Sequence, residues 1–352
     1  MKRIISILAV VCCAVACVGQ KEDMISQALT LKPDRLSADI DGIVPVTFSV
    51  TDGGVNVTSA AEIWEMVSGE PAVRLDNTTF TPSEAGTYYF AAKHNEMFSA
   101  QVKIDAYSSA ECKSEGHDFF RRHIVLDFTG TWCVNCPRMA EAVHQASQTG
   151  EFYDRMIDVA VHWTDEFMIK EGEALVDKWN YKQLPYVVVD MDKSTEVNGK
   201  QTQSEFIMTG LRKTGGYFAH PCGVKVSTCV EGESLNVDAE VTITETGSYN
   251  ICALLLRDGV VAPQKNGAEN YVHSSILIGS LSGAIDSGVA LGDGELSAGS
   301  VVNHSFSCEL SKIEDFENTR VVVYVMQSHN GVNVVNNATQ CPVGSSVEYR
   351  YE

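Results

Sequence analysis

The stretch that most constrains the fold is LDFTGTWCVNCPRM, residues 126–139. Here a short apolar run, IVLDF, leads into two cysteines that are three residues apart, and the residues after them have helical spacing. An apolar run of this length is typical of a strand that is buried on both faces. The pattern therefore predicts Cys133 at the end of a strand just before a helix, and Cys136 one turn further on and on the same side, so that the two can form a disulfide.

A cysteine beside the start of a helix has unusual chemistry. The first backbone N–H groups of a helix are unpaired and carry partial positive charge, which stabilises a thiolate. Such a thiol loses its proton near or below neutral pH, whereas an ordinary cysteine needs about pH 8.5. We expect Cys133 to be the exposed nucleophile and Cys136 to be the resolving thiol that releases a mixed disulfide.

Two other interpretations of the cysteine pair are weighed against redox chemistry. A zinc site needs a second pair or histidines at ligand spacing, and the sequence offers neither, so we expect no metal and no cofactor. A permanent structural disulfide remains open as an alternative. It is disfavoured because such a pair closes too short a loop to stabilise the chain much.

The motif also resembles a known family. DFTGTWCVNC is similar to the DF-x-x-x-W-C-x-x-C motif of the thioredoxin superfamily, and DKWNYKQLPYVVVDMD resembles its helix, cis-proline and strand. The resemblance implies that Asp127 is a buried acid that helps move the proton of Cys136. It also implies that Trp132 precedes the reactive pair and that Pro185 is a cis-proline that shapes the substrate groove beside Cys133. The dipeptide between the cysteines lacks the proline common in reductants, so the direction of exchange stays open.

The first residues resemble a bacterial lipoprotein signal. Lys2 and Arg3 precede an apolar run of 13 residues that ends in AVAC, which predicts a signal peptide over residues 1–16 and resembles a lipobox with Cys17 as the lipidated residue. Residues 17–27 read as a tether, and VGQKEDM resembles the surface-export signal of Bacteroidetes lipoproteins. We therefore expect an outer-membrane protein, held by a lipid anchor and exposed at the cell surface.

The rest of the chain divides by pattern. Short alternating runs over residues 28–107 predict an immunoglobulin-like β-sandwich, and a second series over 221–352 predicts a C-terminal β-sandwich. Between them, strands alternate with helices over residues 108–220, which, with the resemblance, predicts a central thioredoxin-like α/β domain. The expected fold class is therefore multidomain α+β, with these three domains in order.

The whole arrangement resembles the Omp28-related outer-membrane proteins of Bacteroidetes, a likeness that implies location and architecture more than substrate. With a net charge of −20, the protein is not attracted electrostatically to the phosphate backbone of nucleic acid, so nucleic acid is not an expected partner. The expected partners are protein thiols and disulfides of the cell envelope, together with the outer membrane through the lipid anchor.

Two hypotheses for function follow. In the first, the protein exchanges thiols and disulfides on envelope proteins; in the second, it is a non-catalytic binding or structural lipoprotein whose centre is only a scaffold. The remaining cysteines of the mature chain allow many pairings, and the sequence favours none of them. They are Cys112, Cys222, Cys229, Cys252, Cys308 and Cys341.

Overall fold

The computed structural model describes residues 29–41, 45–53, 55–68, 71–268, 270–313 and 315–352. The predicted signal peptide, Cys17 and the tether therefore lie outside the described residues. The described part of the chain forms 25 strands and four α-helices, so the protein is mostly β. Within the described residues, no helix is long and apolar enough to cross a membrane.

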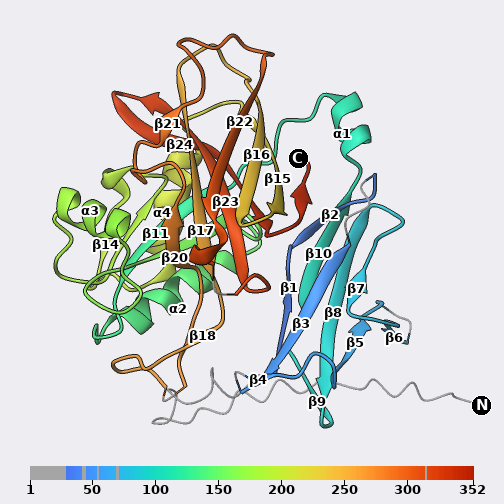
Figure 1. The fold of residues 1–352 in the computed structure, drawn as a ribbon. Helices are drawn as coiled ribbons and strands as arrows, with labels where there is room; N and C mark the ends of the chain where they lie inside the picture. Colours follow the sequence, from blue (N-terminus) through green and yellow to red (C-terminus); the bar gives the residue numbers. More distant parts are fainter. Residues whose placement is uncertain (1–28, 42–44, 54, 69–70, 269, 314) are drawn as a thin grey trace, which may run out of the picture.

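The N-terminal segment is a β-sandwich, as its alternating pattern predicts (Figure 1). One sheet contains β1 (Thr30–Pro33), β3 (Val46–Asp52), β4 (Val55–Asn56) and β7 (Thr79–Phe80). The other contains β2 (Ser37–Asp39), β10 (Val102–Tyr107), β8 (Gly86–His94), β5 (Glu62–Glu65), β6 (Val73–Arg74) and β9 (Met97–Phe98). The sheets share one apolar core, in which the rings of Phe48 and Phe90 lie 4.9 Å apart.

The centre and the C-terminal segment share one nine-stranded sheet. Its central strands are β11 (His123–Thr129), β12 (Met156–His162), β13 (Tyr186–Val189) and β14 (Val197–Asn198). Its C-terminal strands are β20 (Ile276–Ser280), β17 (Tyr249–Arg257), β23 (Thr319–His329), β24 (Val332–Pro342) and β21 (Val289–Ala290). β11 runs parallel to β12 and antiparallel to β13. The two halves join where β12 pairs with β20, Ala160 lying opposite Ile276.

This sheet corrects the predicted fold class. We expected an independent thioredoxin-like α/β domain over residues 108–220, but the molecule is mostly β and the central strands do not form a sheet of their own. The reason lies at the edge of β12. An exposed strand edge leaves backbone groups unpaired, and the C-terminal segment satisfies them, for example through the Ala160 N–H that donates to Ser275 O at 2.8 Å. The prediction of β-sandwich character is confirmed.

Helices and a second sheet cover the two faces of the long sheet. On one face, α3 (Lys170–Trp179) packs over a core shared by β11, β12, β17 and β23. On the other face, α2 (Cys136–Ser147) and α4 (Ser204–Gly215) cover β11 and β13. The apolar run of β11 is therefore buried on both sides, as its sequence predicts.

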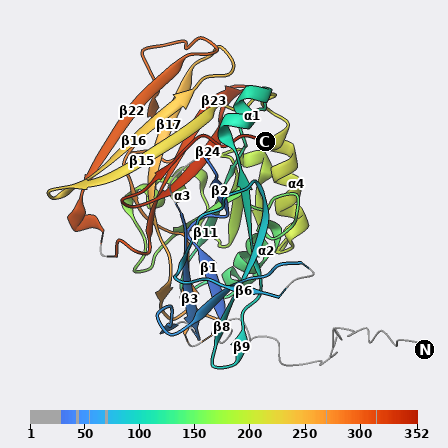
Figure 2. The same ribbon diagram turned by 90° about the vertical axis from the view of Figure 1, so that its right-hand side faces the viewer.

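A four-stranded sheet covers the C-terminal half of the long sheet (Figure 2). It consists of β22 (Val301–Glu309), β16 (Ser234–Thr242), β15 (Gly223–Glu231) and β25 (Ser346–Val347). A separate two-stranded ribbon, β18 (Val260–Val261) and β19 (Val272–His273), extends from the end of β17. The short elements that remain are α1 (Ser109–Glu115), η1 (Lys193–Thr195) and η2 (Leu310–Lys312).

Buried charges link the N-terminal sandwich to the rest of the molecule. Arg122 binds Asp154 with its Nη2 at 2.8 Å from Oδ2, and Arg350 forms an ion pair with the same oxygen. Arg122 also reaches Ser37 of the sandwich at 3.5 Å. Because Asp154 and both guanidinium groups are largely removed from water, each charge depends on its partners.

Candidate redox-active site

A disulfide joins Cys133 to Cys136 at the carboxyl end of β11. The S–S distance is 2.09 Å and the two Cα atoms lie 5.5 Å apart. β11 ends at Thr129 and the helix α2 begins at Cys136, so Cys133 lies in the connecting loop. Pro137 falls in the first turn of the helix, where its missing N–H would be unpaired in any case.

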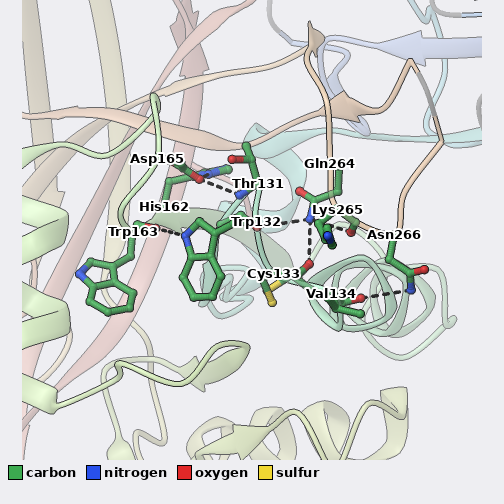
Figure 3. Close-up of a disulfide and its surroundings, with 12 residues drawn as sticks. Thr131, Trp132, Cys133, Val134, His162, Trp163, Asp165, Gln264, Lys265 and Asn266 are labelled. Atoms are coloured by element: carbon green, nitrogen blue, oxygen red, sulfur yellow. Dashed lines mark hydrogen bonds and ion pairs between the residues drawn. A yellow bond between two sulfur atoms is a disulfide. The ribbon is translucent and has the colours of Figure 1, made fainter.

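Both cysteines are nearly hidden from solvent. Cys133 is 3% exposed and Cys136 is 2% exposed. The expectation of an exposed nucleophile at Cys133 is therefore wrong for this conformation. In the tertiary structure, segment 264–266, more than a hundred residues away in the sequence, lies against the loop that carries Cys133 (Figure 3).

Trp132 stands at the surface next to the disulfide and is 44% exposed. Its Nε1–H donates to the backbone carbonyl of Trp163 at 2.9 Å, and the two rings meet edge to face (Figure 3). A Cβ atom at Gly130 would lie 2.9 Å from the Trp132 Nε1, so this position needs glycine. The position of the Trp132 ring therefore depends on the absence of a side chain at residue 130.

Asp127 is buried six residues before Cys133, on the face of β11 that also carries Val125 and is covered by α2. In the paired strand, Val125 lies opposite Asp158 and Asp127 lies opposite Ala160. Asp127 and Asp158 are therefore diagonal neighbours on the same face of the sheet. For both, the Oδ1 atom is shielded from solvent and finds no hydrogen-bond partner among the described residues.

This environment favours protonated carboxyl groups. Burial raises the pKa of Asp127 well above its usual value, and the nearby Asp158 carboxyl raises it further. Burial likewise raises the pKa of Asp158 to about 7. The side chain of Tyr271 faces the same pair, and burial together with the two carboxyls raises its pKa to about 12. Two carboxyl groups with raised pKa values thus lie side by side, Asp127 on the strand that leads to the cysteines and Asp158 on the neighbouring strand β12.

Pro185 lies at the same end of the sheet. The Leu184–Pro185 peptide bond is cis, as the resemblance implies. The next residue, Tyr186, begins β13 and lies opposite Phe128 of β11. A Cβ atom at Gly199 would lie 3.0 Å from the proline ring, so the chain passes very close to it. The sheet therefore brings Pro185 to the edge from which the cysteine loop leaves.

A buried histidine network, which the sequence did not single out as a site, supports the loop. His162 Nδ1 lies 2.7 Å from Asp165 Oδ2, and the same oxygen accepts the backbone N–H of Thr131 at 2.8 Å. Burial alone would raise the pKa of Asp165, but His162 and the N–H groups of Thr131 and Phe167 hold it below its usual value. This network orients the residue that comes two before Cys133.

The segment 264–266 makes four hydrogen bonds to the cysteine loop (Figure 3). The Lys265 N–H donates to Thr131 O at 2.7 Å. Gln264 Nε2 donates to Cys133 O at 3.0 Å and Gly130 O at 3.3 Å. Asn266 Nδ2 donates to Val134 O at 3.3 Å. In the sequence this segment belongs to the stretch LLLRDGVVAPQKNG, and no local signal pairs it with the cysteines.

The other thiols are not arranged for the same chemistry. Cys112, Cys222, Cys229, Cys252 and Cys341 form no disulfide. Burial raises the pKa of Cys222 to about 12 and that of Cys252 to about 11, which keeps both thiols protonated. In the part of the chain that the structure describes, no group of three or more histidine, cysteine or acidic side chains is placed to hold a metal ion.

Comparisons with known proteins add a fold relative. No family model and no curated protein matches the chain. Among solved structures, the chain is similar to HBP35 of Porphyromonas gingivalis, a Bacteroidetes protein, with a TM-score of 0.53 and 18% identity over 64% of this chain and 76% of that one. At this identity the likeness shows a shared fold alone. A β-glucosidase from Kluyveromyces marxianus matches 37% of this chain and 14% of its own, at 14% identity, and its TM-score of 0.19 carries no argument.

Proposed function

We propose that the protein is a cell-envelope protein that exchanges thiols and disulfides through Cys133 and Cys136. The observation that carries this proposal is a disulfide between cysteines three residues apart at a strand-to-helix loop, with Asp127 buried on β11 and the shielded Asp158 carboxyl beside it on β12. Short-loop disulfides add little stability, so a closed pair in this position favours chemistry over structure. The protein partners would be those with accessible thiols or disulfides.

The exchange proceeds in two steps from the oxidised state. A substrate thiolate attacks Cys133 Sγ, the Cys133–Cys136 bond breaks, and Cys136 leaves as a thiolate that takes a proton from Asp127. A second substrate thiolate then attacks the mixed disulfide, and Cys133 leaves as a thiolate. The substrate has gained a disulfide, and the protein holds two thiols. An envelope disulfide then oxidises the two protein thiols and restores the starting state. In the reverse sequence the two thiols reduce a substrate disulfide, and an envelope dithiol restores them.

The location of the protein is the second part of the proposal. A leader over residues 1–16 and lipidation of Cys17 would hold the soluble body on the outer membrane, facing outward, as in the Omp28-related proteins that the sequence resembles. The N-terminal sandwich would then separate the redox site from the membrane. Metabolic labelling with a fatty acid tests this: the wild-type chain is expected to be labelled, and Cys17→Ala is not.

A second function is favoured by one specific observation. Because both cysteines are almost fully buried, the disulfide can instead be a structural element of a non-catalytic binding protein. In that case the pair would resist reduction. The two candidates differ in the redox behaviour of a single bond.

A redox titration of the protein lacking its leader separates the two, with the thiols read by differential alkylation and mass spectrometry. Exchange activity predicts a reversible transition at roughly −270 to −120 mV, the range of known oxidoreductases. It also predicts that Cys133→Ser abolishes exchange with a peptide disulfide, whereas Cys229→Ser, at an exposed cysteine on β15 that forms no disulfide, has no effect. A pair that remains oxidised below about −300 mV supports the structural alternative.

A further inference from the structure

The ribbon of β18 and β19 carries the segment 262–268 onto the cysteine loop. In the contact with the cysteine loop, the donors come from residues 264–266 and the acceptors are backbone carbonyls of residues 130–134. Gln264 is itself buried, and its amide nitrogen lies within hydrogen-bonding distance of two carbonyls, Gly130 O and Cys133 O. It is the best-connected side chain in this contact.

The base of the ribbon packs against the network behind the cysteine loop. The ring of His273 lies 5.5 Å from that of His162 and 5.3 Å from that of Phe167. Tyr271 lies 4.8 Å from His273 on the ribbon itself. The base of the ribbon is thus held by ring contacts to the buried His162 and His273, whereas 264–266 is held by hydrogen bonds, which are easier to release locally.

This arrangement has a consequence for access. A substrate sulfur must meet the Cys133 Sγ, yet Cys133 is almost fully buried while Trp132 and Val134 on either side of it are exposed. The neighbouring residues are therefore open to a partner, and the sulfur is not. Movement of 262–268 away from residues 130–134 is the displacement that frees backbone of the cysteine loop without disturbing the buried base of the ribbon.

We propose that segment 262–268 is a gate over the Cys133–Cys136 disulfide and that Gln264 is the residue that holds it closed. This proposal rests on the proposed function, because a gate would determine which substrate thiols reach the reactive cysteine pair. In the closed state, only partners that displace the segment are able to react. Gln264 acts on access and makes no contact with the reacting sulfurs, so it should alter the rate of exchange and leave the redox potential in place.

The test is the rate at which dithiothreitol reduces the disulfide in the full soluble chain, followed by alkylation. Gln264→Glu keeps the side-chain shape, removes both N–H donors and sets a carboxylate against two carbonyl oxygens. We expect it to speed reduction about tenfold, the usual effect of losing one or two hydrogen bonds. The midpoint potential should stay within error of the wild type.

The matched control is Asn250→Asp on β17. It also replaces a side-chain amide that donates to a backbone carbonyl, Ser287 O at 2.8 Å, and it should leave the rate unchanged. Asn266→Gly is a second variant that keeps the fold, because the φ of Asn266 is +61°, which glycine adopts readily. It should speed reduction about threefold, as expected for one exposed hydrogen bond.

The outcomes are distinguishable from those of the proposed function. If dithiothreitol reduces the disulfide of neither variant faster than that of the wild type, the gate is wrong, even if Cys133 still exchanges with peptide disulfides. If both variants reduce faster but no potential in the oxidoreductase range is found, the gate stands as a shield over a structural disulfide and the exchange function falls. A faster rate in Asn250→Asp would also overturn the gate.

Discussion

The substitution Asp158→Asn tests whether the candidate site holds buried protonated acids. Asp158 is only partly buried as a residue, but its Oδ1 is shielded and unbonded within the described structure. Burial raises its pKa from 3.8 to about 7, and Asp258 contributes to the rise while Arg320 opposes it. The folded protein therefore holds a proton that the unfolded chain releases between these pH values.

The sign of the effect follows from the two pKa values. Because the folded state binds more protons, this group makes the protein most stable below about pH 4, and that contribution is lost as the pH rises towards 7. The full difference corresponds to about 4 kcal/mol, which we reduce to about 2–3 kcal/mol for a partly buried residue. Asparagine carries no charge at any pH, so Asp158→Asn should gain this amount over the wild type between pH 4.5 and pH 8.

The assay is urea unfolding of both proteins at the two pH values, with the difference between variant and wild type as the readout. Asp293→Asn removes an exposed carboxyl and serves as the control, with no pH-dependent difference expected. If the difference between Asp158→Asn and the wild type is the same at pH 4.5 and pH 8, the carboxyl is ionised throughout. The idea that Asp158 keeps its proton in the folded protein would then be wrong.

Two further predictions concern buried charge. Asp154→Asn keeps a side chain that tolerates the φ of +59° but leaves Arg122 and Arg350 unpaired, so it should lower the free energy of unfolding by about 3 kcal/mol in urea. Burial and the neighbouring His162 lower the pKa of His273 to about 4, so stability should fall as the pH drops from about 6.5 towards 4. Between pH 7 and pH 5 the unfolding temperature of His273→Phe should fall by about 2 °C less than that of the wild type. An equal fall in both proteins would contradict the lowered pKa of His273.

Local patterns in the sequence were enough for the strand, the loop and the helix around the cysteines. IVLDF is buried on both faces because apolar side chains stand at every position of β11 except Asp127 and the two ends. The disulfide and the cis bond before Pro185 also follow from residues that lie next to each other or match a short motif. The β-sandwich character of the N-terminal segment follows from its period of two.

Contacts between distant parts of the chain were decided only by the tertiary structure. The pairing of β12 with β20 joins residues more than a hundred positions apart, and any strand of suitable shape could have satisfied that edge. The contact of Gln264 with Cys133 O also joins distant residues, and only the pairing of β11 with β12 brings Asp158 beside Asp127. Backbone hydrogen-bonding groups are the same at every residue, so the sequence does not specify which distant segments pair. The sequence determined which residues can carry the chemistry. Packing decided which of those residues meet and that both cysteines are buried.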